Sequence, residues 1–157
     1  MPRPPFRPPI GLQLARTSHV VSQAFERAMA EAGGSASAWQ VLLLVRSQQW
    51  DTQAGMAAAM GISGATLTHH LNALEARGLV RRWRDSSNRR VQQAELTDAG
   101  KALFDRLREV AVGHDARLRS KLTDAETELL AELLRKLQAG LEGRAVESVE
   151  ADAAAGP

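Results

Sequence analysis

The sequence contains no cysteine, and this absence excludes several chemistries at once. Without thiols the chain can form no disulfide, can bind no iron–sulfur cluster or zinc through thiolates, and can sense no oxidant through a cysteine. It also lacks any apolar run close to the roughly 20 residues that a membrane-spanning helix needs. The first nine residues carry arginine but not the apolar core of a signal peptide. We therefore expect a cytoplasmic protein with no membrane partner.

Signatures of catalysis and of cofactor binding are missing as well. The sequence has no Ser–His–acid constellation, no P-loop and no glycine-rich nucleotide motif. His69 and His70 are adjacent, and successive residues of a helix diverge by about 100°, so the two rings cannot bind one metal ion together. His19 and His114 are isolated in the sequence. These observations argue against an enzyme, a cofactor and a metal site.

The overall composition is that of one globular domain. The chain has 157 residues, of which 44% are hydrophobic and 24% are charged, and this is enough for a substantial core. Five of the six prolines lie in residues 1–9, which predicts an extended arm. Beyond Gly140 the apolar spacing gives way to Ala, Glu and Gly, which predicts a disordered tail over residues 143–157.

Apolar spacing predicts helices along most of the chain, at about 10–32, 35–48, 52–60, 64–77, 98–122 and 124–140. The second is apolar around much of its circumference and is expected to be the central core helix. The first and last helices carry more apolar surface than a small domain can cover. We therefore expect them to bind a second copy of the chain, with closure of a monomeric bundle as the alternative.

The stretch from Gly61 to Leu96 combines a helix with a hairpin. Leu67, Leu71 and Leu74 have the spacing of a helix with one buried face, and a glycine suits its C-terminal end. Strands are predicted at 79–83 and 91–96, joined by a polar turn at 85–90. Helix, strand, basic turn and strand together predict a winged helix.

Positive charge is concentrated in the same stretch. Residues 61–94 hold six arginines against two acids, a net charge of +4, although the whole chain carries only +2. Residues 1–16 add +3, and residues 141–157 carry −3. A basic patch on a winged helix is the electrostatic signature of a DNA-binding protein. Each charge cluster by itself is also typical of an ordinary solvated surface.

These segments together resemble the MarR family of bacterial transcription regulators. The resemblance is carried by the helix–Gly–Ser–helix of residues 52–77, the LEARGLV of Leu74 to Val80, the turn from Asp85 to Arg90 and the LTDAG of Leu96 to Gly100. It implies a mainly α fold with a small β-wing, extending over about residues 10–142. A winged helix-turn-helix at about 36–97 would lie between dimerisation helices at about 10–33 and 98–142. It also implies a homodimer that binds double-stranded DNA, with a helix of each subunit in a major groove and each wing in a minor groove.

DNA contacts are expected first near the start of the helix at 64–77. Residues there that face away from the leucines can reach base edges or phosphates, and they are Ser63, Ala65, Thr66, Thr68 and His69. A pure capping role is the alternative for Ser63.

The wing supplies the second set of expected DNA contacts. Arg81, Arg82 and Arg84 are expected to bind phosphates, or else only to solvate a strand face. The family pattern has an acid two residues before the arginine that enters the minor groove. Arg90 matches that arginine, but Asn88 stands where the acid would be, and Arg89 is the alternative inserter.

Many members of this family release DNA when a small aromatic acid binds where the dimer helices meet the winged domain. The resemblance suggests Arg16, His19, Trp39, Leu43 and His114 as residues lining such a site. Arg16 could pair with a carboxylate and Trp39 could stack on a ring. A surface arginine, solvated histidines and a packed tryptophan are the alternative.

The functional prediction is a sequence-specific transcription regulator that needs no cofactor. In this interpretation it is a ligand-responsive repressor that binds a pseudo-palindromic operator as a homodimer. The alternative is an architectural DNA-binding protein without sequence preference, which would bind all duplexes equally and lose affinity steeply with salt.

Overall fold

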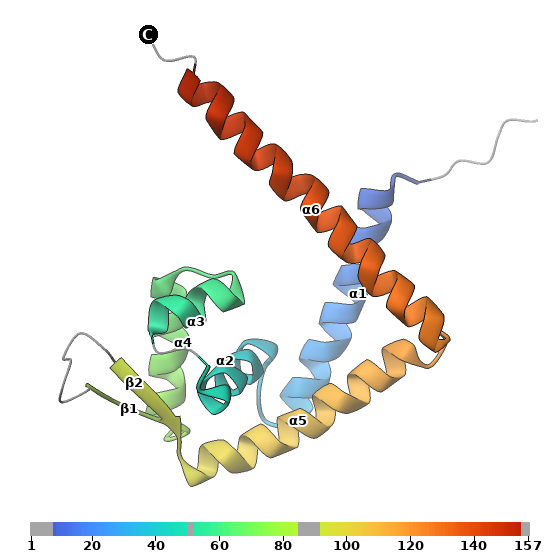
Figure 1. The fold of residues 1–157 in the computed structure, drawn as a ribbon. Coiled ribbons are helices and arrows are strands. Elements are labelled where there is room, and N and C mark those ends of the chain that lie inside the picture. Colours follow the sequence, from blue (N-terminus) through green and yellow to red (C-terminus); the bar gives the residue numbers. More distant parts are fainter. Residues whose placement is uncertain (1–7, 50–51, 85–91, 155–157) are drawn as a thin grey trace, which may run out of the picture. The chain divides into compact units, whose positions relative to one another are not determined.

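The computed structural model describes residues 8–49, 52–84 and 92–154, and of Arg84, Gln92 and residues 142–154 it describes the backbone alone (Figure 1). Within these ranges the elements are α1 (Ile10–Glu31), α2 (Ala36–Ser47), α3 (Gln53–Met60), α4 (Gly64–Ala76), β1 (Val80–Arg84), β2 (Gln92–Leu96), α5 (Asp98–Arg119) and α6 (Asp124–Ala154). The chain divides into two compact units, Met1–His114 and Asp115–Pro157, and the division falls within α5.

The predicted fold class, mainly α with a small β-wing, is confirmed. The largest difference from the predicted elements lies at the C-terminal end, where α6 continues to Ala154 although a disordered tail was expected over residues 143–157. Ala, Glu and Arg are good helix formers, and their propensity outweighs the cost of Gly140 and Gly143. Of the expected arm at 1–9, residues 1–7 lie outside the described part, and Pro9 is the N-cap of α1.

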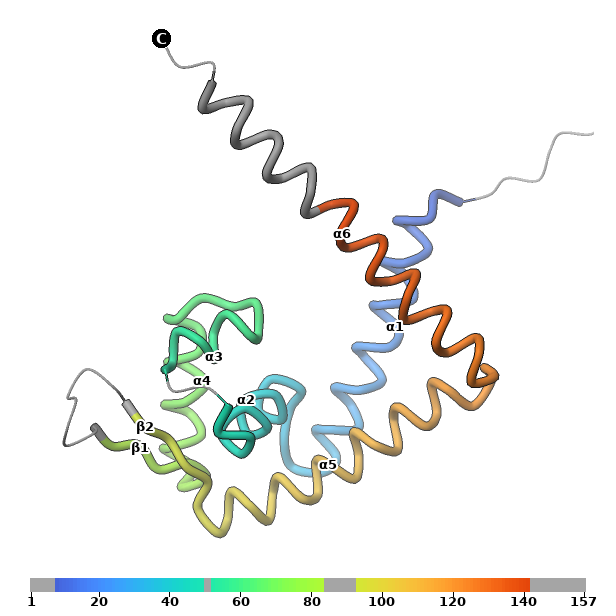
Figure 2. Tube along the Cα trace, viewed as in Figure 1, coloured from blue at the N-terminus to red at the C-terminus, as the bar shows by residue number. Residues whose placement is uncertain are grey.

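α2 is the central helix of the first unit, as predicted. Its N-cap is Ser35, whose Oγ accepts a hydrogen bond from the backbone N–H of Ala38 at 3.1 Å. Val41, Leu42 and Val45 are buried, and α2 contacts α1, α4 and β2. Figure 2 shows α2 in the middle of this unit, between α1 and α4.

α3 and α4 form a helix-turn-helix. Thr52 caps α3 by accepting from the backbone N–H of Gly55 at 3.1 Å. Gly61 ends it with φ of +65°, a left-handed conformation that favours glycine. In α4, Leu67, Leu71 and Leu74 are all buried, which confirms the predicted apolar face.

β1 and β2 form an antiparallel pair in which Val80 is opposite Leu96 and Arg82 is opposite Ala94. Val80 and Leu96 belong to the core, whereas Trp83 is 41% exposed. Since side chains alternate between the faces of a strand, Arg82 shares the face of Val80, and this face packs against α4. The hairpin therefore has one face on the helix-turn-helix and one face exposed.

The loop after α4 is joined to the start of α5 by a short network. The backbone N–H of Thr97 donates to the Leu79 carbonyl at 3.1 Å, and the Thr97 hydroxyl donates to the Gly78 carbonyl at 2.6 Å. The same hydroxyl accepts from the N–H of Gly100 at 3.0 Å. A Cβ atom on Gly100 would lie 1.9 Å from the Leu79 oxygen. The position therefore requires glycine for reasons of space.

None of the described helices combines the length and the apolar character that crossing a bilayer requires.

We predict that Gly100→Ala lowers the free energy of unfolding by about 2 kcal/mol or more, because the added methyl group forces the Leu79 carbonyl away from α5. In a chain of this size the melting temperature would fall by about 5 °C or more. Thermal unfolding followed by circular dichroism measures the change.

Gly113→Ala on the same helix is the matched control, since a Cβ atom there has nothing within 4 Å. It should stabilise α5 by up to about 1 kcal/mol through helix propensity. A Gly100→Ala variant that melts at or above the wild-type temperature would contradict the packing argument.

Candidate nucleic-acid interface

The five residues predicted near the start of α4 all lie on its surface. Ser63, the N-cap residue, is exposed, and so are Ala65, Thr66, Thr68 and His69. They share this surface because the leucines at 67, 71 and 74 turn the opposite face of α4 into the core. The structure therefore places these side chains on one side of one helix, and their contact with DNA stays a prediction.

The hydroxyl groups at this end of α4 are already partly engaged. Ser63 Oγ accepts from the backbone N–H of Thr66 at 3.1 Å and lies 2.8 Å from Thr66 Oγ1. Thr68 Oγ1 donates to the Gly64 carbonyl at 2.9 Å. Ser63 thus caps the helix, which was the alternative to DNA contact, yet it remains exposed and can still meet a phosphate. In this rotamer the Thr68 oxygen is left as an acceptor.

Arg82 lies against α4 rather than pointing to solvent. Its Nε donates to Glu75 Oε2 at 3.0 Å, and its Nη2 lies 2.5 Å from both Glu75 Oε2 and Asn72 Oδ1. The Arg82 side chain is only 11% exposed, while that of Glu75 is 41% exposed. The hydrogen bond from Arg82 holds the pKa of Glu75 below its ordinary value near 4.5. Sequence reasoning missed this pairing, because seven residues and a turn separate the two partners.

The other predicted wing residues differ in what the structure shows of them. Arg81 is exposed, forms an ion pair with Glu95 and lies over the Trp83 ring with 5.7 Å between its Cζ and the ring centroid. Arg84 ends β1, and its side chain is not described. Asn88, Arg89 and Arg90 lie outside the described residues, so their contacts stay predictions.

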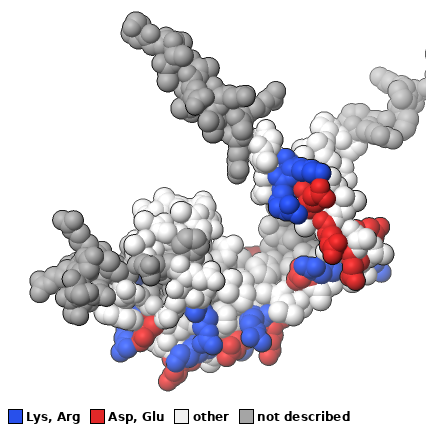
Figure 3. Space-filling model, viewed as in Figure 1, with Lys and Arg blue, Asp and Glu red and all other residues white. Residues whose placement is uncertain are grey.

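Charge is unevenly distributed between α4 and its surroundings. From Thr52 to Leu74 the sequence holds no Lys, Arg, Asp or Glu, and Glu75 near the end of α4 is the first such residue after this stretch. Figure 3 shows side chains of both signs intermixed along α5, where Lys101, Asp105, Arg106, Arg108 and Glu109 are exposed. The positive charge of this region therefore comes from residues after α4, not from α4 itself.

The five residues predicted to line an effector site are not brought into one cluster by the described contacts. Trp39 is half-buried and stacks on Phe104, with ring centroids 5.2 Å apart. His114 lies 5.0 Å from the Phe25 ring, and its buried Nε2 has no hydrogen-bond partner within the described part of the chain. Leu43 is 43% exposed, and Arg16 and His19 are exposed on α1.

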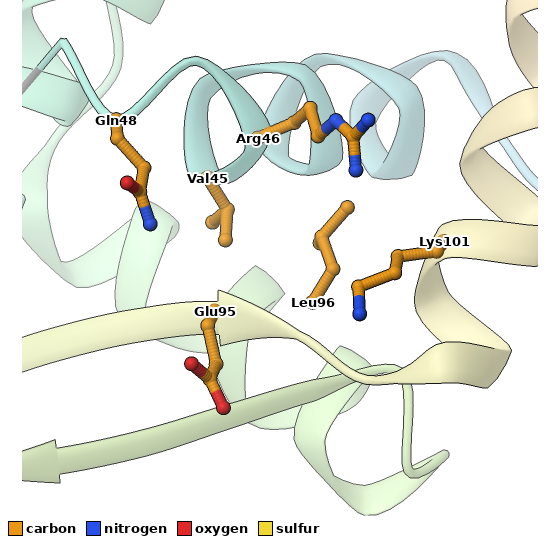
Figure 4. A pocket seen from close by; sticks show the side chains of 6 residues that line it. All are labelled: Val45, Arg46, Gln48, Glu95, Leu96 and Lys101. Atoms are coloured by element: carbon orange, nitrogen blue, oxygen red, sulfur yellow. The ribbon is translucent and has the colours of Figure 1, made fainter.

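A cavity of about 330 Å³ lies elsewhere, between α2, β2 and the start of α5. Figure 4 shows the six side chains that line it, which are Val45, Arg46, Gln48, Glu95, Leu96 and Lys101. Lys101 pairs with Asp98 at 3.0 Å, and the Arg46 guanidinium lies over the Phe104 ring at 5.7 Å. Both cations are thus already engaged, and none of the five predicted effector residues lines this cavity.

A helix-turn-helix whose second helix exposes small polar side chains, next to a two-stranded wing, defines a winged-helix DNA-binding protein. Residues 35–91 match the model of the MarR family. The regulator PecS of Dickeya dadantii is 28% identical over 128 residues, which cover 80% of this chain and 77% of PecS.

Solved structures extend the likeness over most of the chain. The repressor CouR bound to a 23-mer DNA duplex is 30% identical, with a TM-score of 0.75 over 83% of this chain and 92% of CouR. CouR from Rhodococcus jostii RHA1 bound to p-coumaroyl-CoA gives 27% identity and a TM-score of 0.72 over the same shares of the two chains. The DNA binding of BpsR of Bordetella bronchiseptica is regulated by 6-hydroxynicotinic acid. BpsR is 26% identical to this chain, with a TM-score of 0.71 over 82% of this chain and 98% of BpsR. This chain belongs to the MarR family and is a DNA-binding transcription regulator, not an enzyme.

We predict that Glu75→Gln removes part of the stability that the protein has at neutral pH. The lowered pKa means that the ionised carboxylate stabilises the fold above its unfolded-state pKa, and that this contribution is lost as the pH falls through the folded-state value. The difference in melting temperature between wild type and variant should therefore be present at pH 7 and disappear once the pH has fallen through the lowered folded-state pKa of Glu75.

Glu109→Gln is the matched control, since no ion pair or hydrogen bond of the Glu109 carboxylate is found within the described residues. Its melting temperature should follow that of the wild type at every pH. An equal effect of the two substitutions across the pH range would show that the Arg82 pair contributes nothing specific.

Proposed function

We propose that this protein is a homodimeric, sequence-specific repressor that releases a pseudo-palindromic operator when a small aromatic acid binds. The observation that carries the proposal is the exposed surface at the start of α4, which holds no Lys, Arg, Asp or Glu as far as Leu74 and lies next to the wing. Side chains that can form hydrogen bonds but carry no charge suit contacts with base edges, which specify sequence. The relative CouR, at 30% identity, is a repressor bound to DNA.

In this proposal the helix and the wing have separate tasks. The start of α4 enters the major groove, where Ala65, Thr66, Thr68 and His69 meet base edges and Ser63 meets a phosphate. Arg89 and Arg90 enter the neighbouring minor groove, and Asn88 supports their turn. Arg81 and Arg84 lie near phosphates and add to the salt-dependent part of the affinity.

Exposed apolar side chains support a homodimer. On α1, Ile10 and Val20 are 64% and 65% exposed. On α6, five leucines at helical spacing are 38–53% exposed, namely Leu129, Leu130, Leu133, Leu134 and Leu137. Stripes of this kind are costly to leave in water and fit a second copy of the same helices. Two α4 helices about 34 Å apart would then reach successive major grooves.

The effector part of the proposal rests on the aromatic residues of the first unit and on two relatives. Trp39 with Phe104, and His114 with Phe25, present rings, and the free Nε2 of His114 could bond to a polar group of a ligand. Arg16 would pair with a carboxylate, with His19 and Leu43 at the margins. CouR binds p-coumaroyl-CoA, and 6-hydroxynicotinic acid regulates BpsR. To release DNA, the effector must bind the dimer conformation that cannot bind DNA more tightly than the conformation that can.

We predict that the purified protein selects one inverted-repeat sequence from a random pool of duplexes. The double substitution Arg89→Gln and Arg90→Gln should weaken binding to that duplex about tenfold or more. It should also make affinity less dependent on salt. The slope of log K against log [salt] should become less steep by about 0.9 for each phosphate charge that the variant no longer neutralises. Fluorescence anisotropy titrations at several salt concentrations measure both quantities.

The double substitution Arg106→Gln and Arg108→Gln, an equal change of charge at exposed positions of α5, is the control and should leave affinity and slope unchanged. Equal affinity for the selected and a scrambled duplex would favour the architectural alternative. A protein that stays monomeric in analytical ultracentrifugation at the concentrations used would refute the dimer.

We predict that 6-hydroxynicotinic acid or p-coumaroyl-CoA lowers the affinity for the selected duplex. Arg16→Gln should raise the concentration of ligand needed about tenfold, because a charged hydrogen bond is lost, and should leave DNA binding without ligand unchanged. Arg27→Gln, on the same helix and also exposed, serves as the control. If neither compound changes DNA affinity at millimolar concentration, the effector part of the proposal fails for these two ligands.

A further inference from the structure

Arg82 occupies an unusual place for an arginine of a DNA-binding wing. It lies on the packed face of β1, opposite the small Ala94, and its side chain is 11% exposed. Its guanidinium makes three hydrogen bonds, two to Glu75 and one to Asn72, and both partners belong to α4. An arginine held in this way is poorly placed to bind a phosphate, because most of its surface is already covered.

The contact with Asn72 fixes which way the Asn72 amide is turned. A guanidinium has only donors, so the atom of the amide that lies 2.5 Å from Arg82 Nη2 must be the oxygen. The Nδ2 group, with its two hydrogens, is then on the other side of the amide. The assignment of the amide oxygen and nitrogen therefore follows from the fact that arginine can only donate, although the two atoms have nearly the same size.

Asn72 belongs to the same exposed face of α4 as the predicted DNA contacts. It is itself exposed, and it lies four residues after Thr68 and three after His69, so the three side chains are neighbours on the helix surface. Its Nδ2 hydrogens have no hydrogen-bond acceptor among the described residues. The face of α4 therefore carries a free donor one turn beyond Thr68.

We propose that Asn72 contacts the operator as a hydrogen-bond donor, and that Arg82 positions this amide instead of binding DNA itself. The proposal rests on the proposed function, since it needs a sequence that the protein selects. The partner is an acceptor atom of the DNA, either on a base edge (guanine O6 or N7, thymine O4) or a phosphate oxygen. The bidentate contact of asparagine with adenine is disfavoured, because it uses the amide oxygen that Arg82 occupies.

Two substitutions of Asn72 separate the donor from the pairing with Arg82. Asn72→Asp keeps an acceptor for Arg82 but removes the donor, and Asn72→Ala removes both. On the selected duplex each should weaken binding about tenfold or more, the loss expected for one hydrogen bond in each half-site. Because position 72 is exposed, both variants should fold and dimerise as wild type does. Their melting temperatures, measured beside the binding titrations, separate loss of contact from loss of fold.

Arg82→Gln tests the positioning role. It should weaken binding while leaving the salt dependence at the wild-type slope, in contrast to the double wing variant of Arg89 and Arg90. In the Asn72→Ala background the same substitution should have little further effect, because the group through which it acts is gone. A measurement of melting temperature shows whether the folded fraction of each variant is unchanged.

Modified duplexes then distinguish the two kinds of acceptor. Single 7-deazaguanine replacements remove a base acceptor, and single methylphosphonate linkages remove a phosphate charge. At one position the modification should weaken binding by the wild type but not by Asn72→Ala. The atom that was modified there is the partner of the amide.

Two results would overturn the proposal while leaving the proposed function intact. In the first, Asn72→Ala and Asn72→Asp bind the selected duplex as tightly as wild type. In the second, Arg82→Gln lowers the salt slope and acts equally with and without Asn72, which would make Arg82 a phosphate ligand. If instead the wild-type protein selects no sequence at all, the proposed function itself fails.

Discussion

The burial of one face of α4 is the constraint on which the interface depends. Leu67, Leu71 and Leu74 are buried in the core of the first unit, where α4 contacts α2 and β1. A helix anchored along one apolar stripe cannot rotate without exposing it, so the opposite stripe is fixed in orientation as well. The N-cap Ser63 fixes where the helix begins, and Gly78, which follows the C-cap with φ of +68°, fixes where it ends. The buried leucine face thus determines which face of α4 is exposed as the candidate DNA-binding surface.

In the proposed function, affinity and specificity come from different parts of this domain. The helix-turn-helix carries no Lys, Arg, Asp or Glu from Thr52 to Leu74, whereas six arginines follow between residues 77 and 90. Arginines bind phosphates of any sequence, and neutral hydrogen-bonding groups discriminate between bases. Of those arginines, Arg82 is withdrawn from the surface and holds two residues of α4. Net charge therefore overstates how many cations are available to DNA.

Local patterns were sufficient to predict most elements. The leucine spacing of α4, the cap residues at 35, 52 and 63, and the polar turn between two short strands each act over a few residues, so they can be read without knowing the fold. Periodicity does not predict the extent of α6, because the apolar spacing ends near Gly140 while good helix formers continue to Ala154. The arrangement of the effector candidates was not predictable either, since Trp39–Phe104 and Phe25–His114 join residues far apart in the chain.

The sequence by itself determined the class of the protein, the order of its elements and the face of α4 that is exposed, since these depend on periodicity and on caps within single segments. Only the tertiary structure decided the state of each polar group. It placed Arg82, an expected phosphate ligand, against Asn72 and Glu75, and its contact with DNA stays a prediction. It also left no room for a side chain at Gly100. Such contacts form between segments that meet only after β1 has folded back along α4 and α5 has joined the loop between them.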